Sequence, residues 1–167
     1  GKLHRMTVAA RPAAQPGTHP SGTTAVKRAA QLADYLLAAR GAPFSWAAAN
    51  CCHFAAGWVL FATGRSPMAG LPATPTAREA LRLVQQLGGS LRAAWSRQLG
   101  AEPIPAAMAQ VGDVVLIPAP IVPGETELRT GELVGICAGM SAIVATAEGH
   151  HAHVPMSMAA AAWRLPA

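Results

Sequence analysis

Apolar residues in the first two-thirds of the chain recur at three- and four-residue spacing, which is the period of an α-helix. This spacing predicts four helices, over residues 25–40, 50–64, 76–87 and 91–99. Gly41 and Gly64 are stop signals, and Asn50 is a good cap for the start of the second helix. The second helix is apolar on nearly every side, so we expect it to be buried at the centre of the fold.

The pattern changes after Pro103, where short β-rich runs alternate with turn residues. The runs predict strands at residues 114–117, 133–137, 142–147 and 151–155. Residues 159–163 fit either a terminal helical turn or a last strand. Helices first and a meander of strands afterwards predict an α+β fold, in which the N-terminal helices pack on a small antiparallel sheet.

The length and composition predict one folded domain with an N-terminal extension. The chain has 167 residues, of which 51% are hydrophobic and 13% charged, and this balance supports a core. Residues 1–24 are rich in Pro, Gly, Thr and Ala without a period. We therefore divide the chain into an extended basic arm, residues 1–24, and a domain, residues 25–167.

The positive charge is concentrated at the N-terminus. The net charge is +5, and residues 1–28 contain five basic residues and no acidic one, whereas the remaining bases and acids cancel. A basic arm of this kind suits docking on acidic protein, nucleic acid or lipid headgroups. A solvated leader without a partner is the alternative.

Several classes of protein are disfavoured by what the sequence lacks. No apolar run is long enough to span a bilayer, and the basic start has no apolar stretch behind it, so we expect neither a membrane span nor a secretory signal. Three cysteines, two of them adjacent, make a poor disulfide framework and favour a reducing compartment. The chain has no glycine-rich phosphate loop, and its four tryptophans are too scattered for a base-stacking platform. We predict no cofactor and no specific nucleic-acid partner.

The residues around Cys51 are the part of the sequence that indicates chemistry. Cys51 directly follows the expected cap Asn50, so its thiol would lie beside unpaired backbone N–H groups at the positive end of a helix. Cysteine hydrolases use this placement because it favours the nucleophilic thiolate, and the same N–H groups stabilise an oxyanion. Cys51 is the candidate nucleophile, with Asn50 and Cys52 at the cap and oxyanion positions. A cysteine that merely packs in an apolar helix is the alternative for both thiols.

Two histidines near the C-terminus are candidates for the base that would activate Cys51. His53 is unsuitable, because two positions along a helix turn it roughly 200° away from Cys51. His151 and His153 would share one face of a strand and could reach the thiol if that strand packs on the helix. The alternative is an exposed polar edge.

The same cysteines and histidines are numerous enough to bind zinc, but their spacing is unfavourable. Adjacent cysteines on a helix cannot easily chelate one ion, and the chain has no Cys-x2-Cys or His-x3-His pattern. We predict no metal site.

Three short motifs resemble the NlpC class of papain-like cell-wall cysteine peptidases and amidases. Asn-Cys-Cys-His-Phe at residues 50–54 resembles the Asp-Cys-Ser-Gly-Phe start of the nucleophile helix in that class. Val-Gly-Asp-Val-Val at residues 111–115 resembles its Gly-Asp before the first strand. Leu-Val-Gly-Ile-Cys-Ala-Gly at residues 133–139 resembles its His-Val-Gly-Ile-Tyr-Leu-Gly strand. Their common order and spacing make the resemblance moderately specific.

A larger part of the chain, residues 44–163, is similar to a family of uncharacterised small phage proteins related to that class. In this family a Trp-loop-Cys-Cys helix precedes a Gly-Asp strand and a closing Ala-Trp-Arg, which is residues 162–164 here. The resemblance implies a papain-like, NlpC-type fold for the domain. It covers about three-quarters of the chain and omits the arm.

The chain departs from the active members of the class at the positions that matter for catalysis. The strand position that holds their base is Leu133, the position that orients the base aligns with Ala145, and the usual acid before the nucleophile is Asn50. The triad that the resemblance implies is therefore broken. Without a base, an ordinary cysteine is only weakly ionised at neutral pH.

Two functions follow from the resemblance. The first is a component of a phage tail tip or related particle, degraded as a catalyst and acting in assembly or contact with the host envelope. It would bind other particle proteins through its arm and be found in the virion, or in the bacterial cytoplasm before assembly. The alternative is an active cysteine peptidase or amidase that cuts peptidoglycan peptides when phage DNA enters the cell. Cys51 would be its nucleophile and His151 or His153 its replacement base.

Overall fold

A computed structural model describes residues 20–40, 51–118, 131–145 and 151–166. The helices are α1 (Pro20–Ala39), α2 (Cys51–Thr63), α3 (Ala77–Gln86) and α4 (Leu91–Leu99). The strands are β1 (Val114–Pro118), β2 (Glu132–Cys137), β3 (Ser141–Ala145), β4 (His151–Pro155) and β5 (Ala161–Trp163). Two short 3-10 helices, η1 (Ala106–Met108) and η2 (Met156–Met158), complete the described elements.

The predicted helices and strands are confirmed, with small changes at their ends. α1 begins at Pro20, five residues before the predicted start, and a proline is tolerated there because the first turn of a helix leaves its N–H unused. α3 and α4 begin at caps, since the hydroxyls of Thr76 and Ser90 accept hydrogen bonds from the N–H groups of Glu79 and Ala93. The predicted stop Gly41 and cap Asn50 lie outside the described residues.

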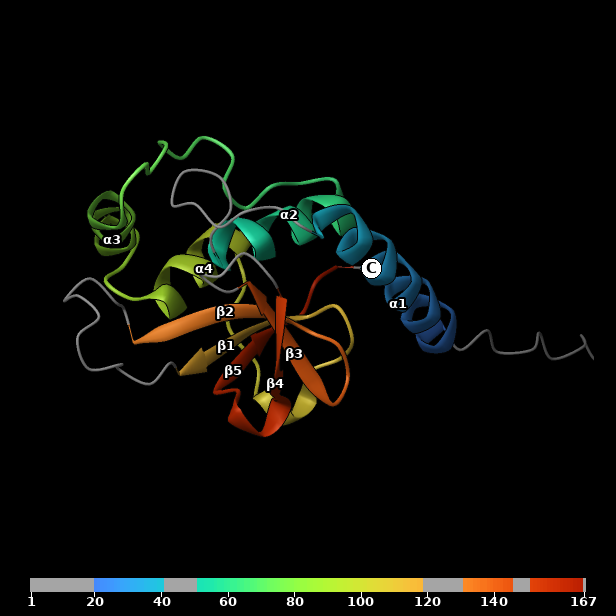
Figure 1. Cartoon of the computed structure of the whole chain (residues 1–167). Coiled ribbons are helices and arrows are strands. Elements are labelled where there is room, and N and C mark those ends of the chain that lie inside the picture. Colours follow the sequence, from blue (N-terminus) through green and yellow to red (C-terminus); the bar gives the residue numbers. More distant parts are fainter. Residues whose placement is uncertain (1–19, 41–50, 119–130, 146–150, 167) are drawn as a thin grey trace, which may run out of the picture.

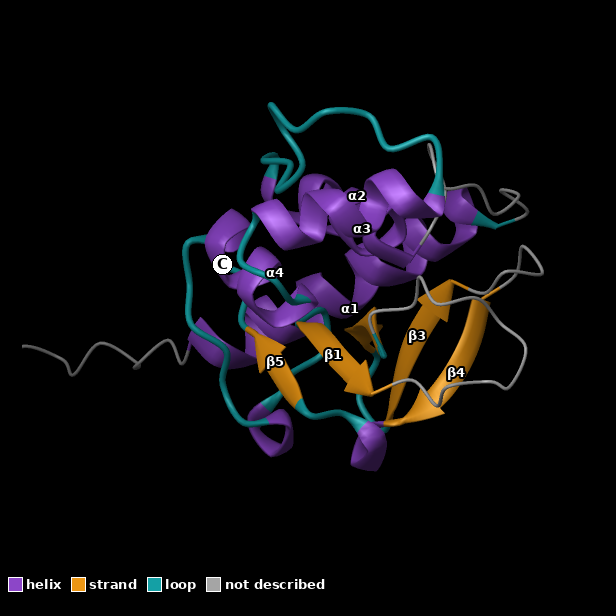
Figure 2. Cartoon of the chain, turned by 90° about the vertical axis from the view of Figure 1, so that its left-hand side faces the viewer, coloured by secondary structure: helices purple, strands orange, loops and turns teal. Residues whose placement is uncertain are grey.

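The five strands form one antiparallel sheet in the order β4-β3-β2-β1-β5. The last segment is therefore a strand, and it pairs with β1 through Val114 opposite Trp163. Figure 2 shows the helices gathered over one face of the sheet, with α2 among them. This confirms the α+β class and the packing of N-terminal helices on a small antiparallel sheet.

The sheet is buried on both faces, because alternate residues of its strands enter two separate clusters. The helix-facing cluster combines strand residues such as Val134 and Ile136 with Phe54, Trp58 and Trp95 from α2 and α4. The opposite face carries the second cluster, built from the following residues: Val115, Ile117, Cys137, Ala142, Val144 and Ala162. Residues flanking η1 and η2 pack against this second cluster.

The helix α2 is central, as its composition predicts, but it is not buried all round. Trp58 is fully buried, whereas Leu60 and Phe61 are each nearly half exposed. No helix in the described ranges combines the length and the apolar character that crossing a bilayer requires.

Gly112 is where α1, α2 and the sheet meet. The indole Nε1 of Trp58 donates a 2.7 Å hydrogen bond to the Gly112 carbonyl, and the aliphatic stem of Arg28 passes over the same glycine. Arg28 is itself buried, and its guanidinium donates to the Pro166 carbonyl at 2.6 Å. Gly112 has φ +90°, and a Cβ there would lie 2.5 Å from the Cγ of Arg28. Both its conformation and its surroundings therefore require glycine.

The Gly-Asp and Ala-Trp-Arg motifs lie next to each other in the structure. Asp113 is buried, accepts a hydrogen bond from the Gln110 N–H at 2.8 Å, and forms an ion pair with Arg164 at 3.3 Å. Trp163 donates from its indole to Ser96 of α4 at 3.1 Å. The two motifs thus fasten the start of β1 to the end of β5, and Asp113 is a turn residue, as predicted.

We predict that Gly112→Ala destabilises the domain by about 3 kcal/mol or more, since a left-handed backbone costs roughly 1–2 kcal/mol for alanine and overpacking adds about 1–3. Gly64→Ala is the matched control, because Gly64 has φ +77° but open space around its Cβ direction. Urea unfolding of both variants separates the two costs. Equal losses of stability in the two would show that the contacts with Arg28 and Trp58 do not matter.

Candidate functional site

Cys51 is the first residue of α2, and its thiol faces the beginning of β2. The side chain is half-buried, and the backbone N–H groups of Val134, Cys52 and Cys51 itself lower its pKa. A helix start leaves its first N–H groups without intrahelical partners, which is why they are available to the sulfur. The N–H of a strand residue adds a donor from the other side.

These donors favour the ionised form of Cys51. A hydrogen bond from the Cys52 thiol has the largest effect, burial opposes it, and the backbone N–H groups add to it, so the pKa of Cys51 falls to about 7. The thiolate of Cys51 therefore forms at a lower pH than that of an ordinary cysteine. An unperturbed cysteine would be almost entirely protonated near neutral pH.

The pKa of Cys52 is shifted in the opposite direction to that of Cys51. Its hydrogen bond to Cys51 and its burial raise the pKa of Cys52 well above the ordinary value, while a hydrogen bond from Trp95 acts in the other direction. Cys52 also packs against the helix-facing cluster. It is therefore a protonated donor to its neighbour as well as a packing residue.

Two residues occupy the positions that align with the base and its orienting residue in active relatives, Leu133 and Ala145. Both carry only alkyl groups, and they lie on opposite faces of the sheet. Leu133 packs against the second cluster, on the face away from α2. The next residue, Val134, is the one that faces the helices. Ala145 packs against the helix-facing cluster and pairs with His151 across β3 and β4.

His151 lies on the helix-facing side of β4 and contacts Phe54, which is about one helical turn from Cys51 on α2. Its ring packs on the ring of Phe54 with 4.5 Å between centroids, and Phe54 follows Cys51 by three residues on α2. Phe54 in turn contacts Tyr35 of α1, whose hydroxyl donates to the Phe54 carbonyl at 2.6 Å. The structure thus brings His151 beside the nucleophile helix, with its ring against Phe54.

The other candidate residues lie in different surroundings. His153 is exposed, and its Nδ1 is 3.2 Å from the hydroxyl of Ser141. Both His151 and His153 line one pocket, which confirms that they share a face of β4.

His53 is half-buried, and burial lowers its pKa. Within the described ranges, no three His, Cys, Asp or Glu side chains are grouped so as to hold a metal ion. His150 and Asn50 lie outside those ranges.

Sequence reasoning missed four contributors to this region: the Val134 N–H, Trp95, Phe54 and Arg40. A backbone donor has no signature in sequence, and Trp95 and Phe54 look like ordinary core residues. Arg40, which lines the histidine pocket, follows the last residue of α1 and looks like a favourable charge at a helix end.

We predict that Cys51 is alkylated rapidly by iodoacetamide with a half-maximal rate near pH 7, because the thiolate is the reacting form. Cys52 and Cys137 should react slowly until the solution is well above pH 8.5, since hydrogen bonding to Cys51 and burial raise the pKa of Cys52 and burial raises that of Cys137. Peptide mass spectrometry after timed labelling between about pH 5 and 9 gives the three rates.

The variant Cys52→Ala tests the cause of this shift. Removal of the thiol donor should raise the pH at which the alkylation rate of Cys51 is half-maximal. This pH should move toward 9.0, the ordinary pKa of a cysteine thiol. Cys137→Ala, a change on the far face of the sheet, should leave it unaltered. A Cys51 rate that is insensitive to Cys52 would contradict the proposed pairing of the thiols.

Comparison with known protein families gives one match. The family described as a domain of unknown function (DUF6950) matches residues 25–165, which run from within α1 to beyond β5 and include both Cys51 and Asp113. Among curated proteins, none matches the sequence. Because the family match spans most of the 167 residues, the chain belongs to the DUF6950 family.

Proposed function

We propose that this chain is a component of a phage tail tip or related particle, with a papain-like, NlpC-type fold whose hydrolase site has lost its base. A cysteine at the first residue of a helix that packs on an antiparallel sheet is what such a fold requires, and Cys51 of α2 meets that requirement. The sequence resemblance over residues 44–163 supplies the phage context.

The proposal depends chiefly on the side chains at the two positions where active relatives hold the base and its orienting residue. Leu133 is an alkyl side chain that packs on the sheet face away from α2. Ala145 offers only a methyl group. Neither can accept a proton from Cys51, and general-base catalysis contributes about 10²–10⁴-fold to a reaction rate.

An exposed apolar stripe on α1, formed by Val26, Ala30, Ala33 and Leu37, supports an assembly role. These residues recur at the spacing of one helix face, and Val26 and Leu37 are 73% and 63% exposed. Large apolar side chains gathered on an exposed face are typical of surfaces that contact other proteins. The stripe follows the basic arm directly in the sequence, so the two together could form one docking segment.

We predict that Val26→Asp lowers incorporation of the chain into purified particles by about tenfold, which corresponds to roughly 1.4 kcal/mol of lost contact energy. Met140→Asp is the matched control, because Met140 is 90% exposed but lies between β2 and β3. Quantitative mass spectrometry of the particles measures incorporation, and thermal melting shows that both variants fold. Absence of the parent chain from particles, or equal incorporation of all three proteins, would contradict the assembly role.

The pKa of Cys51 favours a second candidate function, an active cysteine peptidase or amidase that cuts peptidoglycan peptides. A thiol with a pKa of about 7 needs less help from a base than an ordinary one. The N–H groups around it would also stabilise an oxyanion. His151 packs on Phe54 of the same helix, and its partner across the strands, Ala145, has only a methyl group.

For the enzymatic alternative, we expect Cys51→Ala to abolish the release of soluble peptides from purified peptidoglycan. His151→Gln should lower the rate by about a hundredfold or more, while His153→Gln should have little effect, because His153 is exposed and contacts Ser141. The measurement is chromatography of the released peptides. Peptide release that survives Cys51→Ala would exclude this function, and no release by the parent chain would favour the particle component.

A further inference from the structure

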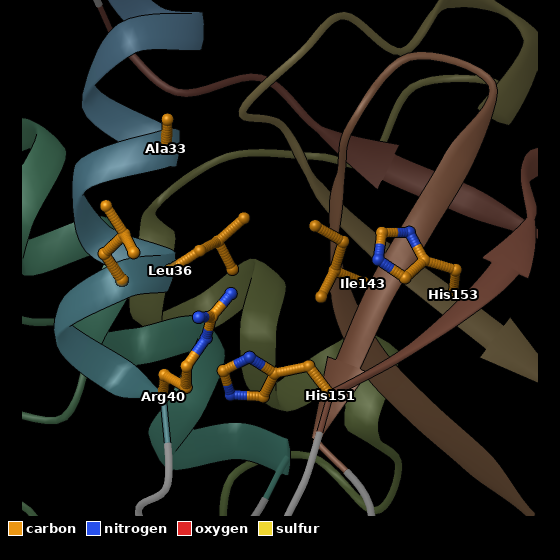
Figure 3. Close-up of a pocket in the computed structure, with 7 residues that line it drawn as sticks. Ala33, Leu36, Arg40, Ile143, His151 and His153 are labelled. Atoms are coloured by element: carbon orange, nitrogen blue, oxygen red, sulfur yellow. The ribbon is translucent and has the colours of Figure 1, made fainter.

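A pocket of about 430 Å³ lies between the C-terminal half of α1 and the paired strands β3 and β4. Its lining includes His151 but neither Cys51 nor Cys52. Figure 3 shows α1 on one side of it and the strands on the other. The helix contributes Arg40 and three apolar side chains, and the strands contribute Ile143, His151 and His153. Its volume is in the range of sites that bind small organic molecules.

The polar part of this pocket suits an anion. Arg40 extends toward the ring of His151 in Figure 3, so the guanidinium and an imidazole face the same space. The described lining residues include no carboxylate, and Arg40 is the one permanently charged side chain among them. A single guanidinium matches a monoanion, and its planar fork matches the two oxygens of a carboxylate.

The remainder of the pocket suits an apolar group. Leu36, Leu37 and Ile143 form its walls, and Ala33 leaves space between them. The two histidines are held in position at its edge, His151 by the ring of Phe54 and His153 by the hydroxyl of Ser141. Apolar walls with a few fixed polar groups at one side are the usual form of a small-molecule site.

We propose that this pocket binds a small organic monocarboxylate with an apolar body, whose carboxylate lies against Arg40 and His151 and whose apolar part lies against Leu36 and Ile143. Binding of this kind requires neither the Cys51 thiol nor assembly into a particle. The pocket shares Ala33 and Leu37 with the exposed stripe on α1, and His151 with the enzymatic alternative. The tests remain distinguishable, because naphthoate binding is measured on the free chain and incorporation on purified particles.

The test is a titration of the isotope-labelled full chain with naphthoate. Binding is monitored by NMR through the chemical shifts of the backbone amides. We expect saturable shifts in α1 and β4 with a Kd of about 1 mM or lower, as the size of the ligand allows. The uncharged amide of the same acid has the same rings and should bind about tenfold more weakly or worse, because it lacks the charge.

Two pairs of variants locate the site. Arg40→Gln should weaken naphthoate binding about tenfold. Arg82→Gln makes the same change of charge on α3, away from the pocket, and should leave naphthoate binding unchanged. Ala33→Phe should block binding by filling the pocket, and Ala29→Phe, at an exposed position of α1 outside the lining, should not.

Equal affinity for acid and amide, or an unchanged affinity in Arg40→Gln, would overturn the proposal, as would the absence of saturable binding. Arg40 is exposed at the end of α1, so its variant is expected to fold even if Ala33→Phe does not. Thermal melting of each variant verifies this.

Discussion

The hydrogen bond from the Trp58 indole to the Gly112 carbonyl fixes where α2 lies on the sheet, and the thiol site depends on that placement. Trp58 is fully buried, so its indole N–H would cost about 1–3 kcal/mol if it lacked an acceptor. Gly112 provides the acceptor because its backbone turns with positive φ just before β1, in a space that has no room for a side chain. The aliphatic part of Arg28 covers the same glycine, so α1 is aligned by the same point.

This arrangement explains why the donors of the site meet although they come from distant parts of the chain. With α2 held at Trp58, its first turn reaches the beginning of β2, where the Val134 N–H contributes to the environment of Cys51. The same first turn carries Phe54, which receives the ring of His151 from the edge of the sheet. The candidate site therefore has backbone N–H groups and Cys52 around the Cys51 thiol, and the ring of His151 against Phe54 in the same first turn of α2. Figure 1 shows the ribbon of α2 lying over the sheet.

Periodicity was sufficient to predict the elements but not the contacts between them. The helices and strands were predictable because their apolar spacing and their caps, such as Thr76 and Ser90, are local features. The face on which Leu133 lies was not, since a shift of one residue in register exchanges the faces of a strand. The packing of His151 on Phe54 joins residues nearly a hundred positions apart, and nothing in a single sequence reports such a pair. For the same reason, the sequence alone does not reveal that Arg40 lines a pocket with His151.

The position of β4 at the edge of the sheet determines which side chains the strand can carry. Inner strands such as β1 and β2 are covered on both faces, so a polar substitution there meets an apolar cluster whichever way it points. On β4 no residue is fully buried, and His153 is exposed to solvent. A polar side chain at the position of His153 thus costs little to folding, whereas His151 is held by its packing on Phe54. Of the two edge strands, β4 tolerates titratable groups and β5, which is buried, preserves the architecture with the inner strands.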